Sequence, residues 1–273
     1  MALISILLIF FAFTPGVEDK KISFVIFGRI YPHFYDFYDS TERINELNPT
    51  FVVLLGDSVK GKLPYNEAFD VLDSAIAKLN SEVLVVSGNP DVDYVNYVDP
   101  DQNRQLEFEK RYGKTSYFVY ENNLFLFLKA YQSNKRTRMF EEDKILIKNF
   151  LNENFDNLFI FSHNEVALID ASLIDDTNKG VVLFLGDFQE FLIELNDNSN
   201  LLLIKNGFER SNYYNDSFIF VTFDPVSGSM NFKVIPLDYA EKTNSFIFNL
   251  EKKVASFVWA TYSKITKQII FQL

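Results

Sequence analysis

Short runs of consecutive apolar residues recur in the first half of the chain, and helix-like stretches separate them. The runs occupy residues 24–27, 51–55 and 83–86. Apolar runs of four or five residues that end at a small residue are typical of strands buried on both faces of a sheet. The stretches 39–47 and 65–79 lie between the runs, and the second carries apolar residues at helical spacing. This strand–helix–strand alternation predicts an α/β fold with a parallel sheet.

The second half of the chain places its predicted strands closer together. Residues 116–120 and 124–128 flank Glu121-Asn122-Asn123, which predicts a hairpin. Residues 140–155 are predicted to form a helix whose core-facing residues are Ile145, Leu146, Phe150 and Leu151. Further strands are expected at residues 158–161, 181–185, 191–195, 201–205, 218–223 and 230–237.

The N-terminal residues 2–13 form an apolar run that ends at Thr14-Pro15-Gly16. Twelve residues are too few for a membrane-spanning helix but suit the core of a signal peptide, although no Lys or Arg precedes the run. We therefore expect residues 1–16 to be a signal peptide and the mature chain to be secreted or extracytoplasmic, without a transmembrane span. A buried N-terminal strand is the alternative.

The C-terminal residues 250–273 have an amphipathic pattern, in which Val254, Phe257 and Val258 lie beside lysines such as Lys252 and Lys253. We expect residues 241–273 to form a helical extension packed on the domain. A helix that lies on a membrane surface is the alternative.

The chain of 273 residues contains two histidines and no cysteine, which excludes several kinds of site. Disulfide bonds, thiol nucleophiles and iron–sulfur clusters all require cysteine. A cage of several imidazoles is excluded as well, because the only histidines are His33 and His163. A metal site must therefore rely on oxygen atoms of Asp, Glu and Asn. The formal net charge of −11 argues against a nucleic-acid partner, which requires a basic surface.

Five of the predicted strands end in a small residue followed by a polar one. In open α/β sheets, ligands bind at the carboxyl ends of the strands, and a glycine there lets the backbone turn sharply. These endings are Gly28-Arg29-Ile30-Tyr31, Gly56-Asp57, Gly88-Asn89-Pro90-Asp91, Ser162-His163 and Gly186-Asp187-Phe188-Gln189. Five such endings in order indicate one ligand site.

The order and spacing of the endings resemble the motifs of the calcineurin-like metallophosphoesterases over residues 22–240. The resemblance also covers Asn45-Glu46-Leu47-Asn48-Pro49, which precedes the second strand. It implies a double β-sheet sandwich flanked by helices (α/β/β/α) for residues 17–240. Members of that family hold two divalent metal ions that share one aspartate and activate a hydroxide against a phosphate ester.

This chain departs from the family pattern at several motif positions. By the resemblance, Arg29 and Tyr31 replace the Asp and His of the first motif, and Lys60 replaces the distal acid of the second. Pro90 stands in place of the His that acts on the phosphate, and Gln189 in place of the last His. One metal of the pair would be left with Asp57 as its single good ligand, so we expect no ion there.

The ligand set of the other metal is retained in type. By the resemblance it consists of Asp57, Asn89, His163 and Asp187. All four side chains can bind a hard or borderline divalent ion, so we expect one ion (Mn, Zn, Fe or Mg) or none. Without an ion, His163 would be a buried imidazole satisfied by hydrogen bonds. Arg29 is expected to pair with Asp57 in place of the missing metal, the alternative being that it turns to solvent.

Three functions follow from these substitutions. The first is a degenerate protein of the metallophosphoesterase fold, inactive or strongly impaired, which acts by binding a protein, carbohydrate or phosphate-ester partner. The second is a single-metal phosphoesterase that uses Arg29 as a phosphate clamp. The third is a structural or surface-assembly protein. The sequence favours the first, because one metal set and the proton-donating His are lost together.

Overall fold

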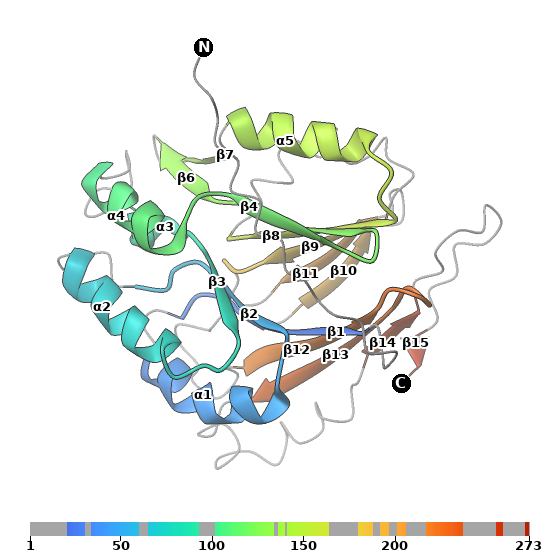
Figure 1. Cartoon of the computed structure of the whole chain (residues 1–273), viewed down its shortest axis with the longest axis horizontal. Helices are drawn as coiled ribbons and strands as arrows, with labels where there is room; N and C mark the ends of the chain where they lie inside the picture. The colour runs from blue at the N-terminus through green and yellow to red at the C-terminus, as the bar shows by residue number, and fades with distance from the viewer. Residues whose placement is uncertain are drawn as a thin grey trace.

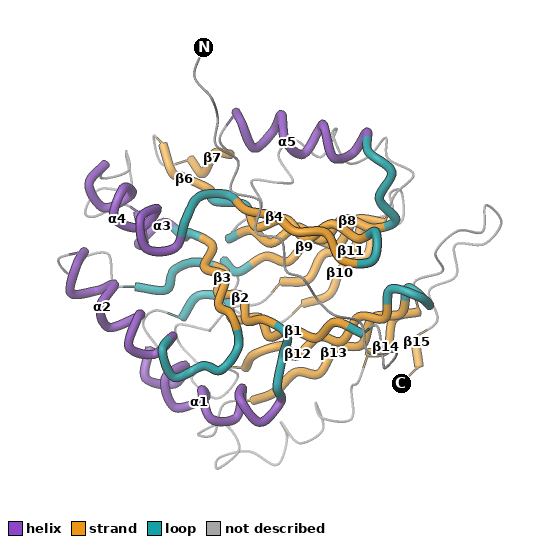
Figure 2. Tube along the Cα trace, in the orientation of Figure 1, coloured by secondary structure: helices purple, strands orange, loops and turns teal. Residues whose placement is uncertain are grey.

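The apolar runs of the sequence form two β-sheets that lie face to face (Figure 1). The computed structural model describes residues 21–30, 34–59, 65–92, 102–133, 136–139, 141–163, 180–187, 192–196, 201–205, 217–236, 255–258 and 271–272. Within these ranges, helices cover the outer face of each sheet, and Figure 2 shows the resulting layers. The order helix, sheet, sheet, helix is the α/β/β/α sandwich that was expected.

The first sheet begins with three parallel strands, β1 (Ile22–Phe27), β2 (Phe51–Leu55) and β3 (Glu82–Val86). Antiparallel strands extend it beyond β1: β12 (Ser217–Asp224), β13 (Ser229–Pro236), β14 (Ala255–Val258) and β15 (Phe271–Gln272). The strand order is β15-β14-β13-β12-β1-β2-β3. Helices α1 (Phe34–Leu47) and α2 (Tyr65–Ile76) pack on its outer face.

The second sheet has a parallel centre as well. Its strands are β4 (Ser116–Tyr120), β5 (Asn123–Phe127), β8 (Asn157–Ser162), β9 (Gly180–Leu185), β10 (Leu192–Asn196) and β11 (Leu201–Lys205). The strand order is β10-β11-β9-β8-β5-β4, in which β5, β8, β9 and β11 run parallel. Helix α5 (Glu141–Asn152) packs on the outer face.

Phenylalanine rings fill much of the space between the two sheets. Phe24 of β1 stacks on Phe51 with ring centroids 4.9 Å apart and meets Phe161 and Phe184 of the second sheet edge-on. Neighbouring residues of β1 point the other way, so that Val25 and Phe27 pack under the helices. Central strands such as β2 and β5 are covered on both faces and are therefore continuous apolar runs, whereas β13 alternates between buried and exposed residues.

The predicted strands are confirmed to within two residues at each end wherever the structure describes them. The helices deviate more, since α1 begins at Phe34 and α2 ends at Ile76. On α5, Ile147 and Phe150 are buried, whereas Ile145 is exposed, so its predicted core position was wrong. The sequence pattern did not predict α3 (Asn89–Val92), α4 (Gln102–Tyr112) or the hairpin of β6 (Ala130–Ser133) with β7 (Arg136–Met139).

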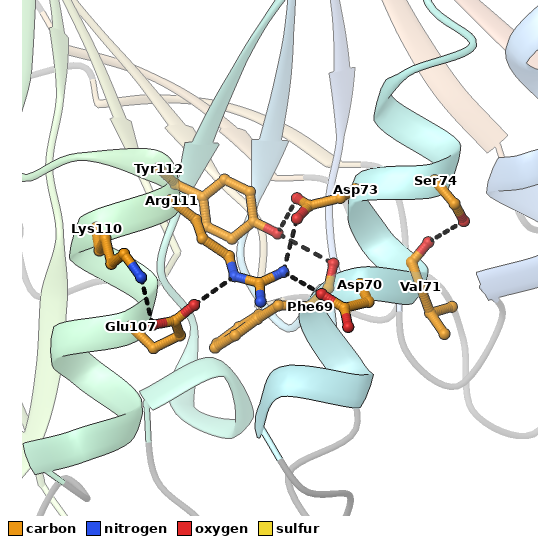
Figure 3. Close-up of polar contacts among 9 residues, drawn as sticks. All are labelled: Phe69, Asp70, Val71, Asp73, Ser74, Glu107, Lys110, Arg111 and Tyr112. Carbon is orange, nitrogen blue, oxygen red and sulfur yellow. Dashed lines mark hydrogen bonds and ion pairs between the residues drawn. The ribbon is translucent and has the colours of Figure 1, made fainter.

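Polar contacts as well as apolar ones hold α4 in place, which explains why the hydrophobic pattern did not reveal it. Arg111 pairs with Asp70 and Asp73 of α2, each at 2.7 Å from Nη1, and its Nε donates to Glu107 (Figure 3). The Tyr112 hydroxyl donates to Asp73 at 2.7 Å. These contacts join α4 to α2 with side chains that a search for apolar periodicity does not register.

The described parts of the C-terminal extension are strands, so the predicted helix over 241–273 is wrong for them. Strand β14 pairs antiparallel with the outer edge of β13, and β15 pairs with β14. The edge of β13 offers unpaired backbone donors and acceptors, and a segment that pairs with them satisfies its own backbone groups. A segment of the length of β14, four residues, is also too short for helical periodicity to decide its structure.

The predicted signal peptide, residues 1–16, lies outside the described residues, and secretion stays a prediction. Among the helices that the structure describes, none combines the length and the apolar character needed to cross a bilayer.

Lys129, just beyond β5, is a buried lysine at the C-terminal end of α4. Its Nζ donates to the carbonyl of Tyr112 at 2.7 Å and to that of Gly113. Carbonyl groups at a helix C-terminus attract a cation. Burial nevertheless dominates and lowers the pKa of Lys129 to about 7, against a smaller opposing effect of Glu109 and Asp91.

This pKa predicts a stability that rises with pH. Between about pH 7 and the ordinary lysine pKa of 10.5, the unfolded chain holds a proton on Lys129 that the folded chain lacks. The free energy of unfolding therefore increases as the pH rises through this window. Urea denaturation at pH 6.5 and pH 9.5 measures the free energy of unfolding of the wild type and of Lys129→Met. The value for the wild type minus that for the variant should be larger at pH 9.5 than at pH 6.5. An unchanged difference would contradict the prediction.

Candidate functional site

Residues at the carboxyl ends of strands from both sheets meet at one edge of the sandwich. Arg29 and Asp57 follow β1 and β2 of the first sheet, while His163 and Asp187 follow β8 and β9 of the second. Arg29, Asp57 and His163 are buried, whereas the Asp187 side chain is 34% exposed and forms the open side of the cluster. The parallel strand ends therefore bring together residues that are 158 positions apart at most, from Arg29 to Asp187.

Three predicted metal ligands converge. One ligand atom from each of Asp57, His163 and Asp187 lies within 4.8 Å of the other two. The Nε2 atom of His163 lies 3.1 Å from Oδ1 of Asp57 and 3.9 Å from Oδ1 of Asp187. Two carboxylate oxygens and one imidazole nitrogen are a donor set for borderline ions such as Mn, Fe or Zn.

A backbone hydrogen bond fixes the orientation of the His163 ring. Its Nδ1 donates to the backbone carbonyl of Leu55 at 2.8 Å, which turns Nε2 toward the carboxylates. Nε2 is buried and makes no hydrogen bond of normal geometry with the described residues. A neutral imidazole that donates to a carbonyl through Nδ1 keeps the lone pair of Nε2 available for a metal ion. The residues present therefore fit one divalent ion.

A proton competes with a metal for this histidine. Burial alone would lower the pKa of His163, but the carboxylates of Asp57 and Asp187 outweigh it and raise the pKa to about 9. Without a metal the imidazole is therefore cationic at neutral pH. Binding of an ion to Nε2 must release that proton, because a ligating imidazole is neutral.

Arg29 contacts both carboxylates of the cluster, as the predicted ion pair requires. Its Nε lies 3.8 Å from Oδ2 of Asp57, and its Nη1 lies 3.4 Å from Oδ1 of Asp187. The prediction of a pair with Asp57 is confirmed, and the contact with Asp187 was not foreseen. The guanidinium stands at the motif position where the family resemblance places a metal-binding aspartate.

The backbone at the strand ends is strained and tightly packed. Arg29 and Asp57 adopt positive φ angles of 49° and 52°, which non-glycine residues rarely do. A Cβ atom on Gly88 would overlap the backbone nitrogen of Asp57, and one on Gly186 would overlap the carbonyl of Leu55. The glycines therefore allow loops from different strands to approach each other, in addition to the sharp turn expected from the sequence.

The structure gives Asp91 a role in joining two loops of the site, which the sequence did not predict. Its carboxylate is fully buried and accepts hydrogen bonds from the backbone amides of Ser58, Val59 and Gly88. Burial and the nearby Asp57 raise the pKa of Asp91 to about 6 despite these hydrogen bonds. The Gly-Asn-Pro-Asp motif was the available signal, but its spacing does not show which backbone groups lie nearby.

The remaining predicted positions are only partly described. Asn89 begins α3 directly after β3, and its side chain lies outside the described parts of the structure. Pro90 follows it in α3. Tyr31, Lys60 and Gln189 lie outside the described residues, as does His33.

Known structures with the same arrangement support the family resemblance at the level of the fold. Comparison with protein-family models gave no match, and comparison with curated proteins gave none either. A dimetal phosphatase from Danio rerio superposes with a TM-score of 0.60 at 13% identity, over 79% of this chain and 96% of that one. A purple acid phosphatase from yellow lupin (Lupinus luteus) gives 0.54 at 12% identity, over 80% and 52% respectively. The chain described here therefore has the calcineurin-like metallophosphoesterase fold.

Proposed function

We propose that this protein is a degenerate metallophosphoesterase-fold protein that holds at most one divalent ion and acts by binding rather than by two-metal catalysis. The observation that carries the proposal is the position of Arg29, whose guanidinium lies beside both Asp57 and Asp187. An arginine cannot ligate a metal ion, and its charge repels one. The ion would bind at Asp57, His163 and Asp187, with Asn89 as a further ligand.

The charges of the site support a single ion. When His163 is neutral, as a metal ligand must be, Arg29 contributes one positive charge against the two carboxylates, and the remaining net charge of −1 favours one divalent ion. At 4 Å and an effective dielectric constant near 20, one such pair is worth about 4 kcal/mol before desolvation. A second divalent ion beside the guanidinium would have Asp57 as its single good ligand among the family's motif positions, and it would meet repulsion from the guanidinium and from the first ion.

The loss of a proton donor points in the same direction. Pro90 carries no proton that could be given to a leaving group, and the family resemblance places a catalytic histidine there. A single ion at the site would supply Lewis-acid polarisation of a phosphoryl oxygen. Arg29 would orient an anion by its fixed fork of N–H donors. Binding of a phosphate ester is therefore retained more readily than its hydrolysis.

The test combines metal counting with an activity assay. We expect elemental analysis and calorimetric titration with Mn²⁺ to give one ion per chain, and nitrophenyl phosphate to turn over at the buffer rate. Asp57→Asn should abolish Mn²⁺ binding because it removes one of the two carboxylates that would bind the ion. Glu67→Gln, on the exposed first turn of α2, is the matched control and should bind as the wild type does.

Two results would overturn the proposal. Two ions per chain would show that Arg29 does not replace a metal. Turnover that is abolished both by Asp57→Asn and by a chelator would show an active enzyme.

A single-metal phosphoesterase is the second candidate, favoured by the partial exposure of Asp187 beside Nη1 of Arg29. An anion entering from this side would meet the guanidinium and the ion together. One ion per chain with metal-dependent turnover, lost in Arg29→Met, would select this candidate.

A further inference from the structure

The carboxylate of Asp91 links the loop after β2 to the turn after β3. Its Oδ1 accepts from the amides of Ser58 at 2.9 Å and Val59 at 3.0 Å, and its Oδ2 accepts from Gly88 at 2.7 Å. Ser58 directly follows Asp57, the residue with φ of 52°. Two of the hydrogen bonds that this buried carboxylate accepts thus fix the backbone on the C-terminal side of a strained residue, and the third ties that segment to the turn after β3.

Arg104 of α4 holds the backbone at Pro90 and Asp91. Its Nε donates to the backbone carbonyls of Pro90 at 3.1 Å and Asp91 at 3.0 Å. Arg104 is fully buried, and its guanidinium lies over the Phe69 ring at 5.4 Å. The short helix α3 is therefore anchored to α4 through its backbone, which fixes the place of the Asp91 carboxylate.

We propose that Asp91 and Arg104 are positioning residues of the candidate metal site, which hold Asp57 in the conformation that directs its carboxylate toward His163 and Asp187. The proposal deepens the function proposed above and rests on it. A left-handed backbone at a non-glycine residue persists only where its surroundings over-determine it. The hydrogen bonds of Asp91 supply that constraint, and Gly88 admits it, because a Cβ there would overlap Asp57.

If Asp91 and Arg104 contributed only to the stability of the fold, any variant that destabilises α4 to a similar extent would weaken Mn²⁺ binding equally. Arg111 provides the matched control for this alternative. Arg111 lies seven residues after Arg104 on α4 and pairs with Asp70 and Asp73 of α2 rather than with α3 (Figure 3). Arg111→Met should lower the stability of the α2–α4 contact. It should leave Mn²⁺ affinity within twofold of the wild type, because it leaves the hydrogen bonds of Asp91 intact.

The experiment compares Mn²⁺ affinity with stability in four variants of the full chain. In Asp91→Asn, the new NH₂ group meets at least one amide donor. We expect Mn²⁺ to bind about 10- to 100-fold more weakly, the range for loss of outer groups that orient metal ligands. Arg104→Met should give a similar loss. Arg104→Lys keeps the charge and should recover part of the Mn²⁺ affinity that Arg104→Met loses. Thermal unfolding without metal ranks the stability of all four.

Amide hydrogen exchange gives a readout that does not depend on metal. Exchange at Ser58, Val59 and Gly88 should accelerate in Asp91→Asn and Arg104→Met, and should stay unchanged in Arg111→Met. If Asp91→Asn does not fold, Arg104→Lys provides the comparison.

The outcomes separate this inference from the proposed function. Wild-type affinity in Asp91→Asn, with affinity lost in Asp57→Asn, would overturn the inference while leaving the metal site in place. A wild type that binds no Mn²⁺ would overturn the metal site. In that case unchanged amide exchange in Asp91→Asn would overturn the positioning role as well. Affinity that falls in parallel with stability in all variants, Arg111→Met included, would also overturn it.

Discussion

Replacement of Arg29 by methionine should destabilise the metal-free protein by about 3–5 kcal/mol, the usual effect of removing one partner of a buried ion pair. The Arg29 side chain is 9% exposed and neighbours the carboxylates of Asp57 and Asp187. Without the guanidinium, these two acids would lose a neighbouring cation and would retain only His163. Urea denaturation at pH 7 with a chelator present measures the difference.

Divalent ions provide the control for the Arg29 variant. If the guanidinium replaces a metal, Mn²⁺ should recover more stability in Arg29→Met than it adds to the wild type, because the variant leaves more uncompensated negative charge. Arg29→Lys keeps the charge without the planar fork and should fall between the two. A stability change below about 1 kcal/mol in Arg29→Met, the range of exposed ion pairs, would show that Arg29 does not neutralise the site.

Truncation of Phe24 to alanine should cost about 3–5 kcal/mol, the range measured for large-to-small changes at aromatic core positions. Phe24 is fully buried in β1 and contacts rings of both sheets, among them Phe51, Phe125 and Phe161. Alanine would leave a cavity between the sheets that rigid neighbouring strands cannot close. Thermal and urea denaturation should both report the loss.

Two further substitutions calibrate this result. Phe24→Leu removes less volume and should cost less than the alanine variant. Val119→Ala, on the edge strand β4, truncates a side chain that is 49% exposed and should change stability by no more than about 0.5 kcal/mol. Equal effects of Phe24→Ala and Val119→Ala would contradict the assignment of the core to the space between the sheets.

The sequence predicted the central strands of both sheets well because these strands are buried on both faces. Burial forces an unbroken apolar run such as residues 51–55, and polar loops bound that run sharply. The apolar pattern of the sequence did not predict the elements that depend on partners far away in the chain. Helix α4 is joined to α2 through the ion pairs of Arg111, and β14 forms on the edge of β13. The contacts that stabilise these two elements therefore involve partner residues far away in the sequence, which a local hydrophobic pattern does not reveal.

The order of residues along the chain shows that Asp57, His163 and Asp187 stand at strand ends with Arg29, and so it limits the chemistry that the site can use. Their contacts follow from the packing of the two sheets: Arg29 reaches Asp187 as well as Asp57, and the carbonyl of Leu55 orients His163. The tertiary structure also makes Asp91 the hydrogen-bond acceptor of the two backbone amides that follow Asp57. The physical reason is that local sequence fixes the order of groups along a strand, whereas the packing of two sheets fixes the ångström-scale distances between groups far apart in the chain.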